Sequence, residues 1–205
     1  MRNMILACLL SASLACLAIP TGLNMMPTAE VLESGQSRLT YETPNGGKLN
    51  VPYGSSILGT QNGSLFGTEA GIDNITDVGT VYNFKWRFVN NKAAGVQVAV
   101  GAQNLAEHTQ YFGVLTKSIG RVQVSAGAIT GIGDPDNDET AAMIGARVDL
   151  RPFVLMADHV QGDTVKRSAG SIGVRLSSLT LLGTGYDFDG GDTEYTMTVS
   201  YGHRY

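Results

Sequence analysis

The chain is short of charged residues and of cysteine, and each shortage excludes a class of protein. Charged side chains make up 16% of its 205 residues, well below the quarter that is typical of soluble domains. The two cysteines, Cys8 and Cys16, both lie near the N-terminus, so a mature chain without that segment has no disulfide. The net charge of −4 comes with no basic stripe, which argues against nucleic acid as a partner.

Long apolar runs are also scarce, and the longest one is typical of a targeting segment. Arg2 precedes an apolar stretch over Met4–Ala18, which is too short to cross a bilayer as a helix. We therefore predict a signal peptide over residues 1–18 and export from the cytoplasm. Lipidation at Cys16 is the less favoured alternative, because Leu14 is one position too close to the cysteine for a good lipobox.

The rest of the chain has many glycines and few prolines, 26 against 6, and it alternates in the manner of strands. From Ser37 onward bulky residues alternate with small or polar ones, a period that places one set on each face of a sheet. The last segment is the clearest, with bulky residues at every second position that include Tyr195, Val199, Tyr201 and Tyr205. An apolar-faced strand that ends on an aromatic residue is typical of the closing strand of an outer-membrane β-barrel.

Loop lengths favour a membrane barrel over a soluble sandwich. Tyr82, Phe84, Trp86 and Phe88 alternate with polar residues, and this pattern alone fits both folds. Counted back from the C-terminus, longer connections alternate with tight turns, the longer ones at 189–194, 161–167 and 131–139 and the tight ones at 177–179, 150–152 and 118–121. Bacterial barrels have this asymmetry. We therefore predict an all-β fold, a transmembrane antiparallel up-and-down β-barrel over residues 37–205.

We predict about 12 strands, with ten as the fallback, because the number of strands in such a barrel is expected to be even. The number must be even if both termini lie on the periplasmic side, and the segments from Leu65 onward provide ten. Ser37–Glu42 and the weaker Lys48–Thr60 complete twelve, with turns expected at Pro44–Gly47 and Gln61–Ser64. The closing strand is then expected to pair with Ser37–Glu42.

Apolar and polar residues follow no regular period over residues 19–36, and two interpretations of this segment stay open. It forms either a connector from the signal peptide to the first strand or a small plug, and the pattern favours the connector. Thr28 could cap one helical turn here.

Charged residues gather on the face opposite the bulky one, where we expect them to line the lumen. They act either as a selectivity lining or, as we favour, as a ladder of opposite charges that closes the lumen. The predicted lumen-lining residues are Glu69, Asp73, Lys85, Arg87, Arg121, Arg147, Asp149, Asp158, Arg175, Asp187 and Arg204.

One acidic loop is a weak candidate for a cation site. Carboxylates at Asp134, Asp136, Asp138 and Glu139 have a spacing that suits calcium. The alternative is a solvated loop that divalent cations bridge to lipid headgroups. We predict no catalytic residue and no cofactor, because none of the three histidines adjoins a serine and an orienting acid. The expected partners are the outer-membrane bilayer, the barrel-assembly machinery and a polysaccharide or small solute.

Four stretches of the chain resemble one family of bacterial barrels. These stretches look like segments of YjbH-type outer-membrane proteins. They are Gly22–Leu32 with Gly35, Asn83–Phe88, Phe153–Val160 and Gly173–Leu176. The resemblance implies a barrel associated with exopolysaccharide production. The leading hypothesis is a narrow channel or export-associated barrel. The alternatives are a closed structural or surface-interaction barrel and, third, an outer-membrane enzyme.

Overall fold

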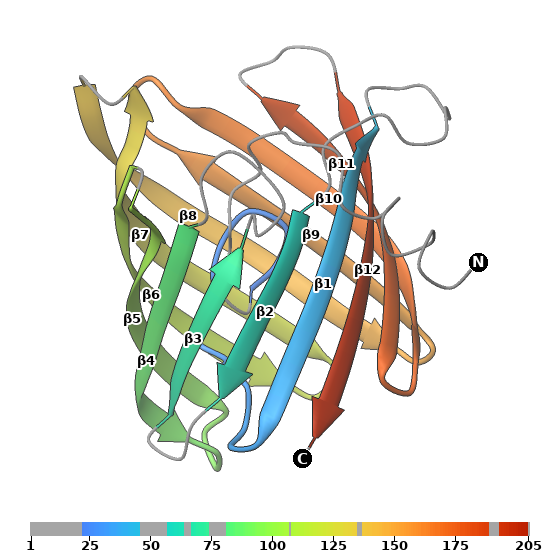
Figure 1. Cartoon of the computed structure of the whole chain (residues 1–205). Helices are drawn as coiled ribbons and strands as arrows, with labels where there is room; N and C mark the ends of the chain where they lie inside the picture. Colours follow the sequence, from blue (N-terminus) through green and yellow to red (C-terminus); the bar gives the residue numbers. More distant parts are fainter. Residues whose placement is uncertain are drawn as a thin grey trace.

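The fold is an antiparallel β-barrel in which every strand pairs with its neighbours in the chain (Figure 1). The computed structural model describes residues 22–45, 57–63, 67–73, 81–106, 108–134, 137–188 and 193–204. These residues form twelve strands: β1 (Gln36–Asn45), β2 (Ile57–Gly63), β3 (Thr68–Asp73), β4 (Val81–Asn91), β5 (Val96–Leu105), β6 (Gln110–Ile119), β7 (Val122–Asp134), β8 (Asn137–Leu150), β9 (Phe153–Gln161), β10 (Lys166–Leu176), β11 (Leu179–Phe188) and β12 (Glu194–Arg204).

The sheet closes between its first and last strands. β1 pairs antiparallel with β2 on one side and with β12 on the other, so the barrel has no open edge. The register places Tyr41 opposite Val199 and Leu39 opposite Tyr201. The predicted twelve-stranded antiparallel barrel and its closing pair are therefore confirmed, although Tyr205 lies outside the described residues.

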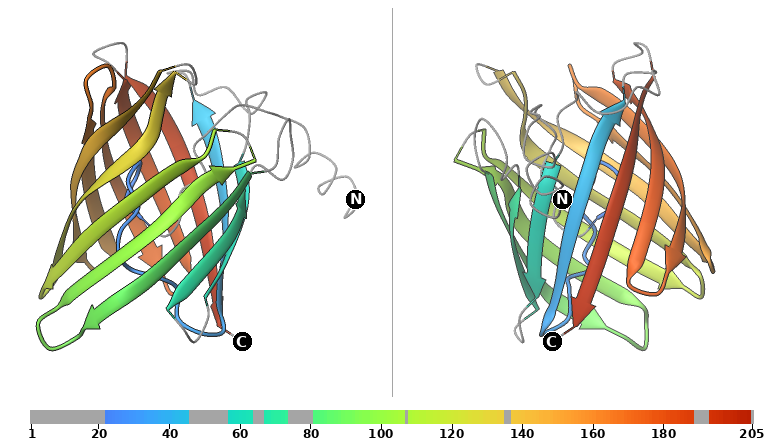
Figure 2. Two further views of the ribbon diagram at one scale, coloured as in Figure 1. Left: turned by 90° about the vertical axis from the view of Figure 1, so that its left-hand side faces the viewer. Right: turned by 45° about the vertical axis from the view of Figure 1, so that its right-hand side comes forward.

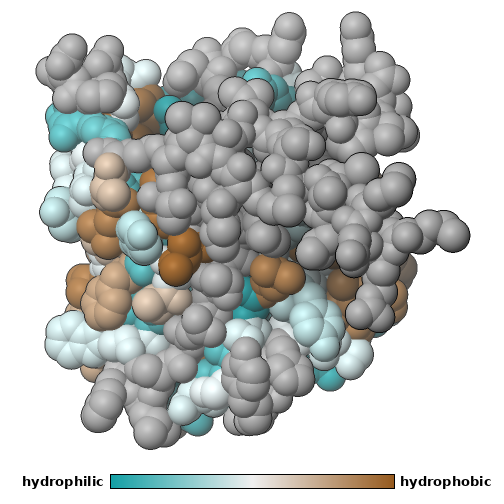
Figure 3. Space-filling view, in the orientation of Figure 1, coloured by the Kyte–Doolittle hydropathy of each residue, from teal (hydrophilic) through white to brown (hydrophobic). Residues whose placement is uncertain are grey.

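The outer face is apolar along most of the strands whose side chains are described. Its exposed large side chains include Tyr82, Trp86, Tyr111, Leu115, Ile144, Phe153, Ile172, Met197 and Tyr201. Water disfavours such a surface, whereas hydrocarbon accepts it. Apolar side chains are visible on the outer wall in Figure 3. The alternation of β3 to β5 and of β7 to β10 follows the prediction, and the barrel spans a membrane with these side chains toward lipid.

The two ends of the barrel differ in their connections. The tight-turn end holds the turns at 92–95, 120–121, 151–152 and 177–178, and the other end is called here the loop end. Three predicted boundaries are wrong. Gln61 and Asn62 continue β2 because they pair with β1, and Gly63 pairs with β3. Pro44 continues β1 because the pairing with β12 extends through it. β7 and β8 likewise extend into the predicted long loop at 131–139, with a bulge at Gly131, whose φ of 78° suits glycine.

β11 presents its faces the opposite way from the prediction. Thr184 and Tyr186 are buried inside the barrel, whereas Leu181 is exposed outside. The prediction placed Asp187 on the lumenal face, and with it Gly183 and Gly185, which occupy alternate positions of the same strand. The outer face also accommodates glycine, since a Cβ on Gly185 would lie 3.3 Å from the ring of Tyr195. Glycine therefore does not identify a lumenal face.

The described residues that precede β1, 22–35, lie inside the barrel, where Figure 2 shows this stretch in dark blue between the walls. We call residues 22–35 the inner segment. It begins with a tight reversal, in which Gly22 bridges Pro27 and the Leu23 amide donates to the Met26 carbonyl at 3.0 Å. Its contacts with the inner wall are those of the plug alternative and not those of the connector that the sequence favoured. None of the described residues belongs to a helix long and apolar enough to cross a membrane.

Candidate functional site

Asp158 of β9 binds the inner segment through three hydrogen bonds. Its carboxylate accepts from the Met25 amide at 2.6 Å, from the Met26 amide at 2.9 Å and from Asn24 Nδ2 at 2.8 Å. Hydrogen bonds to an ionised acceptor are stronger than neutral ones. Asp158 is 5% exposed, and such a buried charge requires partners of this kind. Its position on the small face follows the prediction, and its partner is the chain's own backbone.

Three other wall strands hold the same segment through single hydrogen bonds. Thr116 of β6 accepts from the Ala29 amide at 2.8 Å, and Glu69 of β3 accepts from the Leu32 amide at 2.9 Å. Ser171 of β10 donates to Asn24 Oδ1 at 2.6 Å. Most of these contacts use the backbone of the segment, so they depend on its path more than on its side chains.

An apolar area of the inner wall covers the apolar side of the inner segment. Leu23, Met26 and Ala29 pack there in one cluster with residues that include Ala99, Phe112, Val114, Ile129, Ala141, Met143 and Val160. Met26 is fully buried. Gly145 of β8 leaves room for the segment, because a Cβ at this position would lie 2.3 Å from Leu23 Cδ1. Wall and segment are thus complementary in shape as well as in polarity.

Cations concentrate on the inner wall toward the tight-turn end. We call Arg38, Lys85, Arg87, Arg147 and Arg175 the basic band. Their acidic partners on the wall are Glu69, whose Oε1 lies 3.7 Å from Lys85 Nζ, and Asp149, which contacts Arg147 at 3.3 Å and Arg175 at 3.0 Å. Lys85 and Glu69 are almost fully buried. The contacts of the band on the wall therefore form a network in two parts, one on β3 and β4 and the other on β8 and β10.

Glu30 of the inner segment completes this network. Its Oε2 lies 3.0 Å from Arg147 Nη1, and its Oε1 accepts from Arg147 Nη2 at 3.4 Å. It also interacts electrostatically with Lys85. A single carboxylate thus faces cations on β4 and on β8.

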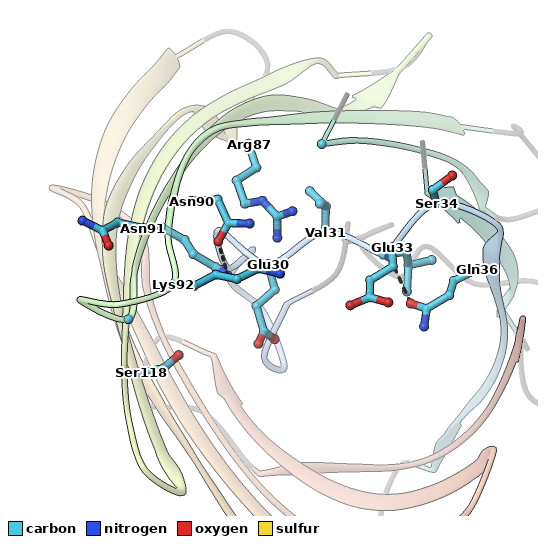
Figure 4. Close-up of a pocket in the computed structure, with 14 residues that line it drawn as sticks. Glu30, Val31, Glu33, Ser34, Gln36, Arg87, Asn90, Asn91, Lys92 and Ser118 are labelled. Atoms are coloured by element: carbon cyan, nitrogen blue, oxygen red, sulfur yellow. Dashed lines mark hydrogen bonds between the residues drawn. The ribbon is translucent and has the colours of Figure 1, made fainter. Parts of the chain in front are cut away.

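A cavity of about 640 Å³ lies beside Glu30 at the tight-turn end. Its lining comes from the inner segment, from β4 and from the turn at 92–95, and it includes Arg87, Asn90 and Lys92. Figure 4 shows the side chains of Arg87 and Glu30 within the barrel outline. The volume falls within the range of about 300–1,000 Å³ that is common for small-molecule sites.

The predicted lumen-lining residues divide into three groups. Glu69, Lys85, Arg87, Arg147, Asp149, Asp158 and Arg175 belong to the inner face. Arg121 and Asp187 do not: Arg121 is exposed in the turn between β6 and β7, and Asp187 is exposed on the face opposite Thr184 and Tyr186. The side chains of Asp73 and Arg204 lie outside the described part of the chain.

The sequence prediction did not identify Asn24, Glu30, Thr116 and Ser171 as residues that attach the inner segment to the wall. Asn24 and Glu30 have no alternating pattern around them that could reveal a partner. One signal was available, because β6 carries apolar residues on both faces and Phe112 and Val114 point inward. An apolar patch inside a barrel requires an apolar cover.

The acidic candidates for a cation site separate in the structure. Asp138 Oδ1 lies 3.0 Å from His108 Nε2, whereas Glu139 accepts hydrogen bonds from the amides of Asp163, Thr164 and Val165. Neighbours on one strand point to opposite faces. Among the described residues, no group of three or more histidine, cysteine, aspartate or glutamate residues gathers to hold a metal. The side chain of Asp134 and all of Asp136 lie outside that part.

These features define a membrane-spanning β-barrel with a charged inner wall and its own N-terminal segment inside. No protein-family model matches the sequence, and no curated protein matches it. Among solved structures the chain is similar to a KdgM porin, with a TM-score of 0.56 and 9% identity over 81% of this chain and 98% of that one.

A second similar structure comes from a study of the in-meso crystallization of membrane proteins. Its TM-score is 0.50, with 11% identity over 83% of this chain and 84% of that chain. At such low identity, both likenesses show the fold.

Proposed function

We propose that this chain is an outer-membrane channel whose lumen is controlled by the inner segment. The observation that carries the proposal is the inner wall, which holds charged groups and a cavity of about 640 Å³ next to the inner segment. The porin-like fold supports a channel in an outer membrane and favours it over an enzyme.

The attachment of the inner segment favours a channel over a closed structural barrel. A barrel that serves only as a scaffold can fill its lumen with wall side chains, as small barrels do. Here the wall leaves room for a separate stretch of chain, and Gly145 is one position where a larger residue would remove that room. The segment is held by individual hydrogen bonds, one ion pair and an apolar contact of three side chains, without a covalent link to the wall strands that it contacts. Its departure would open a path along the charged wall.

The closed structural or surface-interaction barrel remains the second candidate because of one observation. Met26 is fully buried against the wall, and burying such a side chain stabilises by about 1.5–3 kcal/mol. Together with the three hydrogen bonds to Asp158, this contact favours the state in which the inner segment occupies the lumen.

We also propose a polysaccharide as the solute, as the resemblance to YjbH-type proteins implies. The amide and charged side chains that line the cavity, such as Asn90, Asn91 and Gln97, are suited to hydroxyl groups. Swelling of liposomes that contain the barrel, measured with glucose oligomers of increasing length, tests this part. Passage of ions without any sugar would contradict it.

Planar-bilayer conductance tests the channel itself. The full-length mature barrel is compared with a variant that lacks residues 22–33, and heat-modifiable migration on gels verifies that both are folded. We expect brief openings from the full-length barrel and sustained openings from the shortened one. The absence of openings in both, over a wide voltage range, would refute the channel and favour the closed barrel.

A further inference from the structure

We propose that Arg147 forms a carboxylate-binding site that Glu30 fills from within the protein, and that a carboxylate-bearing solute competes with Glu30 for it. The inner segment then acts as an internal substitute for a ligand. This inference deepens the proposed channel function and rests on it for its role, although the binding itself requires no conduction.

The geometry of the pair is that of ligand recognition. Two guanidinium nitrogens of Arg147 face the two oxygens of Glu30, at 3.0 Å for Nη1 and Oε2 and at 3.4 Å for Nη2 and Oε1. Arginine recognises carboxylates through such paired contacts because its donors lie in a rigid plane. The two side chains are 19% and 29% exposed, so the pair is partly shielded but still open to exchange.

The neighbours of Arg147 hold its guanidinium in place. Asp149 Oδ2 lies 3.3 Å from Arg147 Nε, and Asp149 Oδ1 lies 3.0 Å from Arg175 Nη1. Asp149 lies on the Nε side as an ion-pair partner without a hydrogen bond to Nε, and the Nη1 and Nη2 edge faces Glu30 in the lumen. Because Asp149 and Arg175 belong to the wall, this orientation does not depend on Glu30.

The charge of the surrounding wall favours an anion once the segment has moved. The five cations of the basic band outnumber the three wall acids Glu69, Asp149 and Asp158. Glu30 and Glu33 of the inner segment offset this excess. A solute that brings its own carboxylate restores the same balance, and charged linings of this kind select permeating ions.

Access to the site is provided by the cavity at the tight-turn end. Glu30 lines this cavity together with Arg87 and Lys92 (Figure 4). A solute in the cavity is therefore next to the carboxylate that it would replace. The exchange breaks one ion pair and forms another, with no covalent step.

Calorimetric titration of citrate into the folded mature barrel in detergent tests the proposal, with ionic strength kept constant by potassium chloride. Glu30→Gln removes the internal competitor, and we expect it to bind citrate about tenfold more tightly than the unmodified barrel, as removal of a competing bound state predicts. Glu33→Gln is the matched control, because it removes the same charge from the same segment but leaves the Arg147 pair intact. We expect little change from it.

Two further variants identify the site on the wall. Arg147→Gln should abolish citrate binding, and Arg147→Lys, which keeps the charge but loses the paired geometry, should weaken it. Equal tightening by Glu30→Gln and Glu33→Gln, or undiminished binding by both Arg147 variants, would overturn the proposal. Because calorimetry does not require openings, a barrel that binds citrate as expected but never conducts would refute the channel and not the site.

Discussion

Replacing Asp158 with alanine is the most direct test of how the inner segment is held. The change leaves the Met25 and Met26 amides without the carboxylate that accepts from them at 2.6 and 2.9 Å. A buried donor without an acceptor costs about 1–3 kcal/mol. We take the lower figure for each amide, because water can enter a vacated site inside the barrel. The docked state then loses about 2 kcal/mol, and its population relative to the undocked state falls about 30-fold.

Hydrogen–deuterium exchange measures this population without any assumption about conductance. Amides that exchange through local opening do so in proportion to the open fraction. We therefore expect the peptide that contains Met25 and Met26 to exchange about 30-fold faster in Asp158→Ala, while amides in the strands keep their protection. Asp158→Asn keeps one good acceptor and should give an intermediate rate.

Asp187→Ala is the matched control, because it removes an aspartate from the exposed face of β11. Exchange of the inner segment should not change in this variant. If Asp158→Ala is folded and its inner segment exchanges at the original rate, the three hydrogen bonds do not hold the segment and our reasoning about the site is wrong.

Three other changes test the fit of the barrel to its contents and to lipid. Gly145→Ala should accelerate exchange of the inner segment, because the new Cβ would lie 2.3 Å from Leu23 Cδ1 and 2.8 Å from Asp158 Cβ; exchange at the original rate in a folded variant would argue against this close fit. Met26→Ala should loosen the same segment by about 2 kcal/mol, the low end for burial lost at a packed site, and unchanged exchange would show that its burial contributes nothing. Leu115→Arg places a charge on the lipid face of β6 and should lower the free energy of unfolding in lipid by about 2–4 kcal/mol, as urea titration measures. Ala94→Arg is the control, because Ala94 lies in an exposed turn, and it should have no comparable effect. Equal losses of stability in the two variants would contradict the assignment of Leu115 to the lipid face.

The outer wall of the barrel could be predicted because lipid imposes a strict rule on it. A residue such as Trp86 or Tyr82 on one face, with Lys85 on the other, leaves few arrangements that satisfy both hydrocarbon and water. The same alternation predicted the pairing of β1 with β12, and the structure places Leu39 and Tyr201 in register. These are properties of single strands, which a sequence pattern records.

The inside of the barrel was harder to predict because its rule is less strict. A lumen accepts charges, amides, glycine and apolar residues, provided that each has a suitable partner. Gly183 was therefore assigned to the wrong face, and the inward Phe112 and Val114 on β6 gave an ambiguous pattern. The partner of Asp158 lies more than a hundred residues away in the chain, as the separation of 132 residues from Met26 shows, and no local pattern encodes it.

The inner segment is continuous with β1, and this connection makes its return a first-order process. Gln36 begins β1 at the tight-turn end, so a released segment stays tethered beside the lumen that it left. Its effective concentration there is of the order of millimolar, as for short flexible tethers. A solute that keeps the lumen open must therefore be abundant or bind through several groups at once. Closure, by contrast, occurs at the same rate however dilute the protein is in the membrane.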